Sequence, residues 1–159
     1  MMNRIHPIAG FVGFLTILCF WVSTLLVELS GNAAAILAVK TGILWGMIVL
    51  VPSLAITGAS GFRLAGPVRA GLVRAKQRRM PVIAANGLLI LVPCAFVLQR
   101  LAAESQFTPM FYTLQALELL AGAVNLTLIG LNIRDGLRMT RRRRAMRVGG
   151  GTDGPGAAV

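Results

Sequence analysis

The chain has 159 residues, of which 56% are hydrophobic and 13% are charged. Soluble domains usually carry about 25% charged residues, so this composition argues against a water-soluble globular protein. The formal net charge of +11 would by itself also suit a nucleic-acid-binding protein. Two cysteines and one histidine exclude a disulfide scaffold, a four-ligand zinc site and any motif that needs a pair of histidines.

Four long apolar runs dominate the sequence, and they predict helices at about residues 7–28, 33–58, 80–100 and 107–133. About 20 apolar residues suffice for a helix to cross the roughly 30 Å hydrocarbon core of a bilayer. In lipid, only helices and closed barrels satisfy their backbone groups internally. The strands of a barrel would alternate polar and apolar residues, whereas these runs are apolar at consecutive positions. We therefore expect an all-α polytopic membrane protein, a bundle of four transmembrane helices.

The parts of the chain outside these runs are short. We expect residues 1–147 to form a single transmembrane domain, in which residues 62–79 make a basic loop between the second and third helices. Residues 148–159 are rich in glycine, a composition that predicts a disordered tail.

The basic residues are distributed unequally along the chain. Fourteen of the sixteen precede the first apolar run, separate the second from the third, or follow the fourth. By the positive-inside rule, both termini and the 62–79 loop are predicted to be cytoplasmic. The preference for arginine over lysine suggests a genome rich in G and C and hence a bacterium, so the predicted location is a bacterial cytoplasmic (inner) membrane.

A run of four arginines follows the fourth predicted helix. Its members are Arg141, Arg142, Arg143 and Arg144. Because basic residues near the inner leaflet attract anionic lipids, we expect this run to contact phospholipid head groups. The basic residues flank membrane segments and do not mark one face of a soluble domain, so no nucleic-acid partner is expected.

Polar residues recur along the fourth predicted helix at spacings of three and four positions. The series is Gln115, Glu118, Gly122, Asn125, Ile129 and Asn132. Such spacing places these residues on one face of a helix, and we expect that face to look into the bundle. Glu118 is the critical member, because a charge inside the bilayer costs about 2.5 kcal/mol or more on insertion scales. The sequence therefore predicts that Glu118 is either paired with a cation or protonated.

Lys40 is the candidate partner of Glu118. If the second helix begins at the start of its apolar run, Lys40 lies roughly 10 Å inside and can reach Glu118. If the helix begins just after Lys40, the side chain instead extends to the outer surface. The sequence leaves both alternatives open. An ionisable residue inside the membrane is a functional candidate by default, and Gln115 and Asn125 complete this set of intramembrane candidates.

A second polar layer is predicted nearer the cytoplasmic side, formed by His6, Asn86, Asn125 and Asn132. Asparagines that hydrogen-bond across helices commonly hold membrane bundles together. A lone histidine before a helix-starting proline, as in His6-Pro7, is typical of a capping or interfacial residue. A ligand or proton-relay role for His6 is the alternative.

Small residues and prolines mark other positions inside the predicted helices. Gly42 and Gly46 form a small-xxx-small pair in the second helix, which predicts close packing either within the bundle or in a homodimer. Pro52 and Pro93 each remove a backbone donor, so we expect them to kink the second and third helices.

Three functions are compatible with these features. The first is a non-enzymatic accessory, assembly or scaffold component that acts through its helix faces and basic loop, within a homodimer or larger membrane complex. The second is an oligomeric proton- or cation-coupled transporter or channel that uses Glu118. The third is a membrane protein that binds b-type haem or quinone through His6, with Met80 or a second copy's histidine as the other haem ligand. We predict no catalytic residues, metal site or cofactor, so haem b enters only with the third function.

Overall fold

The computed structural model describes the backbone of residues 2–65 and 72–149 and the side chains of residues 6–61 and 78–138. Within these ranges every element is helical, as expected. The elements are α1 (Met2–Ser30), α2 (Ala33–Ala65), α3 (Leu72–Asn86), η1 (Gly87–Leu91), α4 (Val92–Ala103) and α5 (Pro109–Gly149).

Four of the helical stretches are long and apolar enough to cross a membrane. They are His6–Ser30, Ala33–Gly61, Arg78–Ala103 and Pro109–Arg138. The third stretch combines α3, η1 and α4, which follow one another without a break. The all-helical class with four membrane-length helices is therefore confirmed for the part of the chain that the structure describes.

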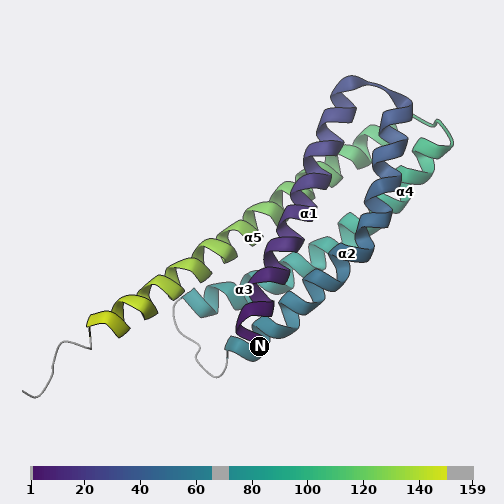
Figure 1. Cartoon of the computed structure of the whole chain (residues 1–159). Helices are drawn as coiled ribbons and strands as arrows, with labels where there is room; N and C mark the ends of the chain where they lie inside the picture. Colours follow the sequence, from purple (N-terminus) through teal and green to yellow (C-terminus); the bar gives the residue numbers. More distant parts are fainter. Residues whose placement is uncertain (1, 66–71, 150–159) are drawn as a thin grey trace, which may run out of the picture.

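The helices run alternately up and down (Figure 1). The α1–α2 and α4–α5 connections lie at one end of the bundle, which we call the connection end. The N-terminus and the last turns of α5 lie toward the opposite end, which we call the terminal end. Short connections between successive helices favour this antiparallel arrangement.

The sequence of the α1–α2 connection explains its sharp reversal. Gly31 adopts a φ of +64°, a left-handed conformation that glycine tolerates and that commonly ends helices. Asn32 then caps α2, because its Oδ1 accepts a hydrogen bond from the backbone N–H of Ala35 at 3.1 Å. This tight turn sets the ends of α1 and α2 side by side.

The third membrane-length stretch contains a π-helical turn at η1. The N–H of Val92 bonds to the carbonyl of Gly87, and Pro93 follows directly with no N–H to donate. A proline inside a helix leaves carbonyls without partners, and a local π-turn is one way to accommodate it. The disturbance that we expected near Pro93 thus takes the form of a wider turn on its N-terminal side.

Several predicted boundaries differ from the structure, most of all those of the loop and of the last helix. Of the predicted loop 62–79, residues 62–65 belong to α2 and residues 72–79 to α3, while residues 66–71 lie outside the described range. Helix α5 continues well past residue 133 and includes the backbone of the arginine run and of residues 148–149. Its extension has no proline or glycine between residues 137 and 147, and arginine is a good helix former. The remainder of the predicted tail, residues 150–159, lies outside the described residues.

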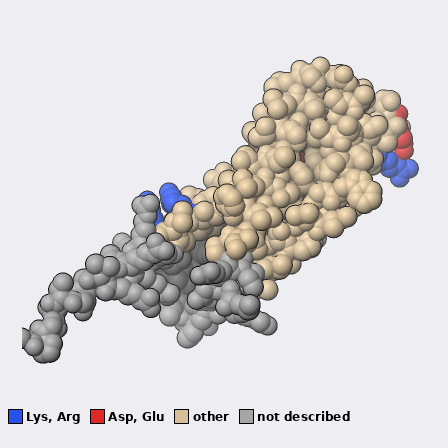
Figure 2. All heavy atoms as spheres, viewed as in Figure 1, with Lys and Arg blue, Asp and Glu red and all other residues tan. Residues whose placement is uncertain are grey.

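Large apolar side chains cover the outer surface of the bundle. Trp45, Leu89 and Leu120 are each about 70% exposed, at 71%, 71% and 68%. In Figure 2 the described charged side chains lie mainly near the two ends of the bundle, and the visible surface between them is almost entirely uncharged. An apolar band between two charged ends is the surface that a bilayer requires.

The two glycines of the small-xxx-small pair have different environments. A Cβ added to Gly46 would lie 2.3 Å from Cζ of Phe20, so this glycine permits close packing of α1 against α2. Gly42 is exposed, and a Cβ there would meet nothing within 4 Å. Gly46 therefore serves packing within the bundle.

Candidate functional site

Lys40 and Glu118 form a buried ion pair between α2 and α5. Lys40 Nζ donates to Glu118 Oε2 at 2.5 Å, and the side chains are 0% and 11% exposed. Helix α2 begins at Ala33, which places Lys40 about 10 Å along it. Of the two alternatives that the sequence left open, pairing is the one that occurs in the structure.

Gln115 joins this ion pair from the preceding turn of α5. Its Nε2 donates to Glu118 Oε2 at 3.2 Å, so the same carboxylate oxygen accepts two hydrogen bonds. The amide is 4% exposed, and its Oε1 is buried without a hydrogen-bond partner. Two of the predicted intramembrane residues therefore lie directly against one another, as their spacing on one helix face requires.

A third charged residue, Glu28 of α1, lies near the same pair. Glu28 interacts electrostatically with both Lys40 and Glu118, and its Oε1 is buried without a hydrogen-bond partner in the described part of the chain. Glu28 is not conspicuous in the sequence, because it stands two positions before the end of α1. Its place becomes clear only from the α1–α2 hairpin, which turns this end of α1 toward the start of α2.

Asn86 and Asn125 join the third membrane-length stretch to α5. Asn86 Nδ2 donates to Asn125 Oδ1 at 2.9 Å and to the carbonyl of Ala121 at 2.8 Å. Asn125 Nδ2 donates to the carbonyl of Ile83 at 3.4 Å, and Asn125 is 1% exposed. These bonds satisfy polar groups in an apolar interior, which is the role expected of interhelical asparagines.

Asn132 lies two turns further along α5, beside a second buried acid. Arg79 Nη1 donates to Asp135 Oδ2 at 2.8 Å and contacts Asn132 Oδ1 at 3.5 Å. Arg134 lies 3.5 Å from the other oxygen of Asp135, which is 1% exposed. The sequence did not identify Arg79 as the partner of this acid, because the two positions are 56 residues apart.

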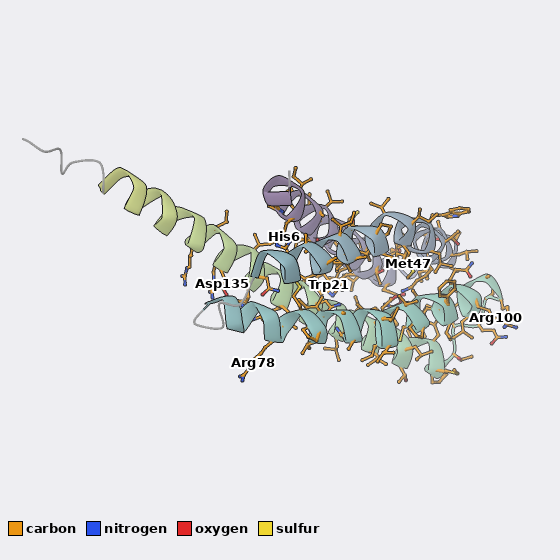
Figure 3. All side chains as sticks on the ribbon, turned by 90° about the horizontal axis from the view of Figure 1, so that it is seen from below. His6, Trp21, Met47, Arg78, Arg100 and Asp135 are labelled. Atoms are coloured by element: carbon orange, nitrogen blue, oxygen red, sulfur yellow. The ribbon has the colours of Figure 1, made fainter. Side chains whose placement is uncertain are left out.

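His6 lies at the terminal end of the bundle, near the start of α1 (Figure 3). Its Nδ1 lies 2.8 Å from Ser60 Oγ of α2. A Cβ on Gly61 would lie 3.3 Å from His6 Cε1 and 3.8 Å from Met80 Cε, so these two side chains approach the same glycine. The partner residue Ser60 was not singled out from the sequence.

The polar layer predicted from His6, Asn86, Asn125 and Asn132 is distributed over several levels of the bundle. Asn125 and Asn132 are seven positions apart on α5, which corresponds to about 10 Å along the helix axis. Asn86 and Asn125 bond to each other, as members of one layer would, whereas His6 contacts Ser60 and Asn132 contacts Arg79. Helical periodicity predicted the shared face of α5 correctly, and of the four predicted members it is Asn86 and Asn125 that hydrogen-bond to each other.

A largely apolar cavity of about 430 Å³ lies between the helices, and all four membrane-length stretches contribute to its wall. Figure 3 shows Trp21 and Met47, two members of the wall, between Arg78 and Arg100 at opposite ends of the bundle. The indole N–H of Trp21 donates to the carbonyl of Leu119 at 2.9 Å, which fixes the ring at the wall.

Three polar side chains reach this cavity wall: Thr24, Glu118 and Asn125. The Oε2 atom of Glu118 is engaged by Lys40 and Gln115, whereas part of the Glu118 side chain is exposed. The cavity thus combines extensive apolar walls with a carboxylate and an amide on its α5 side, a combination common in binding sites for small molecules.

The exposure of two lining residues indicates a lateral opening of the cavity between α2 and η1. Val51 on α2 and Leu88 on η1 both line it, and they are 51% and 66% exposed on the outer surface. Among the described residues, Cα atoms of α2 approach those of α3 and α4 to within 8 Å, whereas none approaches a Cα atom of η1 this closely. The widened turn at η1 therefore coincides with the lateral opening, within the apolar band of the surface.

The predicted lipid contact of the arginine run and the question of a metal site both depend on which side chains the structure describes. The side chains of Arg141, Arg142, Arg143 and Arg144 lie outside the described range. Within the described range, no group of three or more histidine, cysteine, aspartate or glutamate side chains is arranged to hold a metal ion.

Comparisons with protein-family models, with curated proteins and with solved structures found no match to this chain. The fold and the site therefore define this protein only by its structure. It is all-helical in the described part of the chain, with four membrane-length helices, a buried lysine–glutamate pair and a cavity between the helices.

Proposed function

We propose that the protein is an integral membrane protein that binds a lipophilic small molecule in the cavity between its helices. The proposed orientation places the terminal end, with both termini, in the cytoplasm of a bacterial cell. The unequal distribution of arginine supports this orientation. A fusion of green fluorescent protein to the C-terminus should fluoresce, and a periplasmic phosphatase at the same position should be inactive; the opposite pair of results would contradict the orientation.

The observation that carries the binding proposal is the lateral opening of a cavity that has both apolar walls and a polar side. A volume of about 430 Å³ lies within the range of about 300–1,000 Å³ that is usual for small-molecule sites. A ligand that enters between α2 and η1 comes from the bilayer, and its apolar tail can remain in the opening. Its head group would lie against Glu118 and Asn125, so the ligand class is a lipophile with a small hydrogen-bonding head group.

The two tryptophans allow a direct binding test. Trp21 lines the cavity, whereas Trp45 is 71% exposed on the outer surface and lies outside the wall. Trp45→Phe leaves Trp21 as the single reporter, and Trp21→Phe leaves Trp45. With decylubiquinone added to the protein in lipid nanodiscs, the proposal predicts saturable quenching of Trp21 fluorescence. Trp45 should show only the gradual quenching that follows the quinone concentration in the lipid.

Adjacent alanines on α3 provide a matched pair of blocking and control variants. Ala84 lines the cavity, and its neighbour Ala85 does not, although both are exposed. In the Trp45→Phe background, Ala84→Phe should fill the opening and remove the saturable phase, and Ala85→Phe should retain it. Equal quenching in the two variants, or quenching of Trp21 that never saturates, would contradict the proposal for this ligand class.

The other functions expected from the sequence remain predictions. The accessory or scaffold role predicts a protein partner that co-purifies in mild detergent, which mass spectrometry of the intact complex would detect. Haem binding predicts a Soret band in the purified protein. Coupled transport predicts a proton- or cation-dependent flux that Glu118→Gln abolishes in vesicles.

A further inference from the structure

Three ionisable side chains from three helices interact near the connection end: Glu28 of α1, Lys40 of α2 and Glu118 of α5. The thiol of Cys94 on α4 also interacts electrostatically with Lys40 and Glu118. We call Glu28, Lys40 and Glu118 the charged cluster. With all three side chains ionised the cluster has two negative charges and one positive charge, and a neutral thiol does not compensate the difference.

The hydrogen bonds within the cluster show which of the two carboxylates binds the lysine. Glu118 Oε2 accepts bonds from Lys40 Nζ at 2.5 Å and from Gln115 Nε2 at 3.2 Å. Both donors bond to the same oxygen of Glu118. The lysine charge is therefore engaged by Glu118, and the charge of Glu28 is the one left over.

Two oxygen atoms at this place are buried acceptors without donors. They are Glu28 Oε1 and Gln115 Oε1, and Gln115 itself is 4% exposed. A buried polar atom that lacks a hydrogen bond is destabilising, and native structures contain few of them. Protonation of Glu28 would convert one of these acceptors into an O–H donor and would also make the cluster neutral.

We propose that the charged cluster is a proton-binding site that holds one proton at neutral pH, carried by the carboxyl group of Glu28. The reasons are the excess of one carboxylate over the lysine, the engagement of Lys40 by Glu118 and the absence of a donor to Glu28 Oε1 among the side chains that the structure describes. The position of Glu28, two residues from the end of α1, brings the site within reach of protons from the connection end. This inference does not depend on the ligand proposed for the cavity.

Infrared spectroscopy of protein labelled with ¹³C on the glutamate carboxyl groups tests the proposal. The chain contains three glutamates, Glu28, Glu104 and Glu118, and the label separates their carbonyl bands from those of the two aspartates. The expected spectrum at neutral pH contains the C=O band of one protonated glutamic acid. Glu28→Gln should remove this band. Glu104→Gln should retain it, because Glu104 is exposed and paired with Arg100 at 3.0 Å.

A lysine variant makes the count of protons testable. In Lys40→Met the cluster loses its cation, so neutrality requires a second proton, and the intensity of the protonated band should double. Thermal melts of each variant show whether it is folded. The absence of a protonated band in the wild-type protein, or a band that survives in Glu28→Gln, would overturn the proposal.

Discussion

Lys40 Nζ lies 2.5 Å from Glu118 Oε2, although 78 positions separate the two residues in the sequence. The pair joins α2 to α5, and the lysine is fully buried. Removal of one partner from a buried ion pair typically costs about 3–5 kcal/mol, because the other charge is left uncompensated. The pair therefore fixes how α2 and α5 sit against one another.

Lys40→Met should lower the free energy of unfolding by about 3 kcal/mol at neutral pH. Glu118→Gln should cost less, because Lys40 can then interact with Glu28, which already lies within its electrostatic reach. The double variant Lys40→Met/Glu118→Gln should be more stable than Lys40→Met alone. Equilibrium unfolding in mixed micelles measures all three, and a double variant that is less stable than Lys40→Met would contradict a favourable pair.

The Lys40→Met variant should also gain stability as the pH falls. Without the lysine, we expect the folded state to keep the two carboxyl groups of the charged cluster neutral by binding protons, whereas the unfolded state releases them at neutral pH. A folded state that binds more protons is stabilised when the pH decreases. Melting temperatures measured between about pH 8 and pH 5 should therefore rise for Lys40→Met more than for the wild type.

Asn125→Leu should loosen the contact between α3 and α5. The substitution removes the bond from Asn86 Nδ2 and leaves that amide with the carbonyl of Ala121. Interhelical hydrogen bonds in membranes are worth about 0.6–2 kcal/mol, so we expect a loss in that range. Thr127→Val is a suitable control, because Thr127 is exposed and bonds only to the carbonyl of Ala123 in its own helix.

Two ion pairs at opposite ends of the bundle should differ strongly in their effect on stability. Asp135 is 1% exposed and is bound by Arg79 at 2.8 Å, so Asp135→Asn should cost about 2 kcal/mol or more. The pair of Arg100 and Glu104 is exposed, and Glu104→Gln should change stability by less than about 1 kcal/mol. The free energy of unfolding of each variant, measured at low and at high salt, tests this difference. Equal losses in the two variants would show that burial does not distinguish the two pairs.

Gly46→Ala should destabilise the packing of α1 against α2, since the added Cβ would lie 2.3 Å from Cζ of Phe20. Overpacking typically costs about 1–3 kcal/mol. Gly42→Ala is the matched control, because the Cβ meets nothing within 4 Å and alanine favours a helix. Phe20→Leu should rescue Gly46→Ala in part. If Gly42→Ala instead dissociates an oligomer, this glycine marks a contact between copies of the chain.

The sequence could identify Lys40 and Glu118 as candidates but could not decide between pairing and exposure of the lysine. That decision depends on where α2 begins, and a cap at Asn32 sets the start early enough to bury Lys40. The interaction of Glu28 with this pair could not be predicted from the sequence for a related reason. A glutamate near a helix end is ordinarily solvated, and only the hairpin turn at Gly31 directs this one toward the neighbouring helices.

The sequence by itself determined the helical class, the four apolar stretches and the polar face of α5, because composition and a period of 3.6 residues are local properties. Only the tertiary structure decided which polar groups meet, since depth along each helix axis and the angle between helices depend on packing. It placed Arg79 against Asp135, distributed the expected polar layer over several levels, and formed a cavity beside the π-turn at η1. The chain has few charged residues. Inside the bundle, Lys40 and Asp135 form ion pairs with residues from distant parts of the sequence.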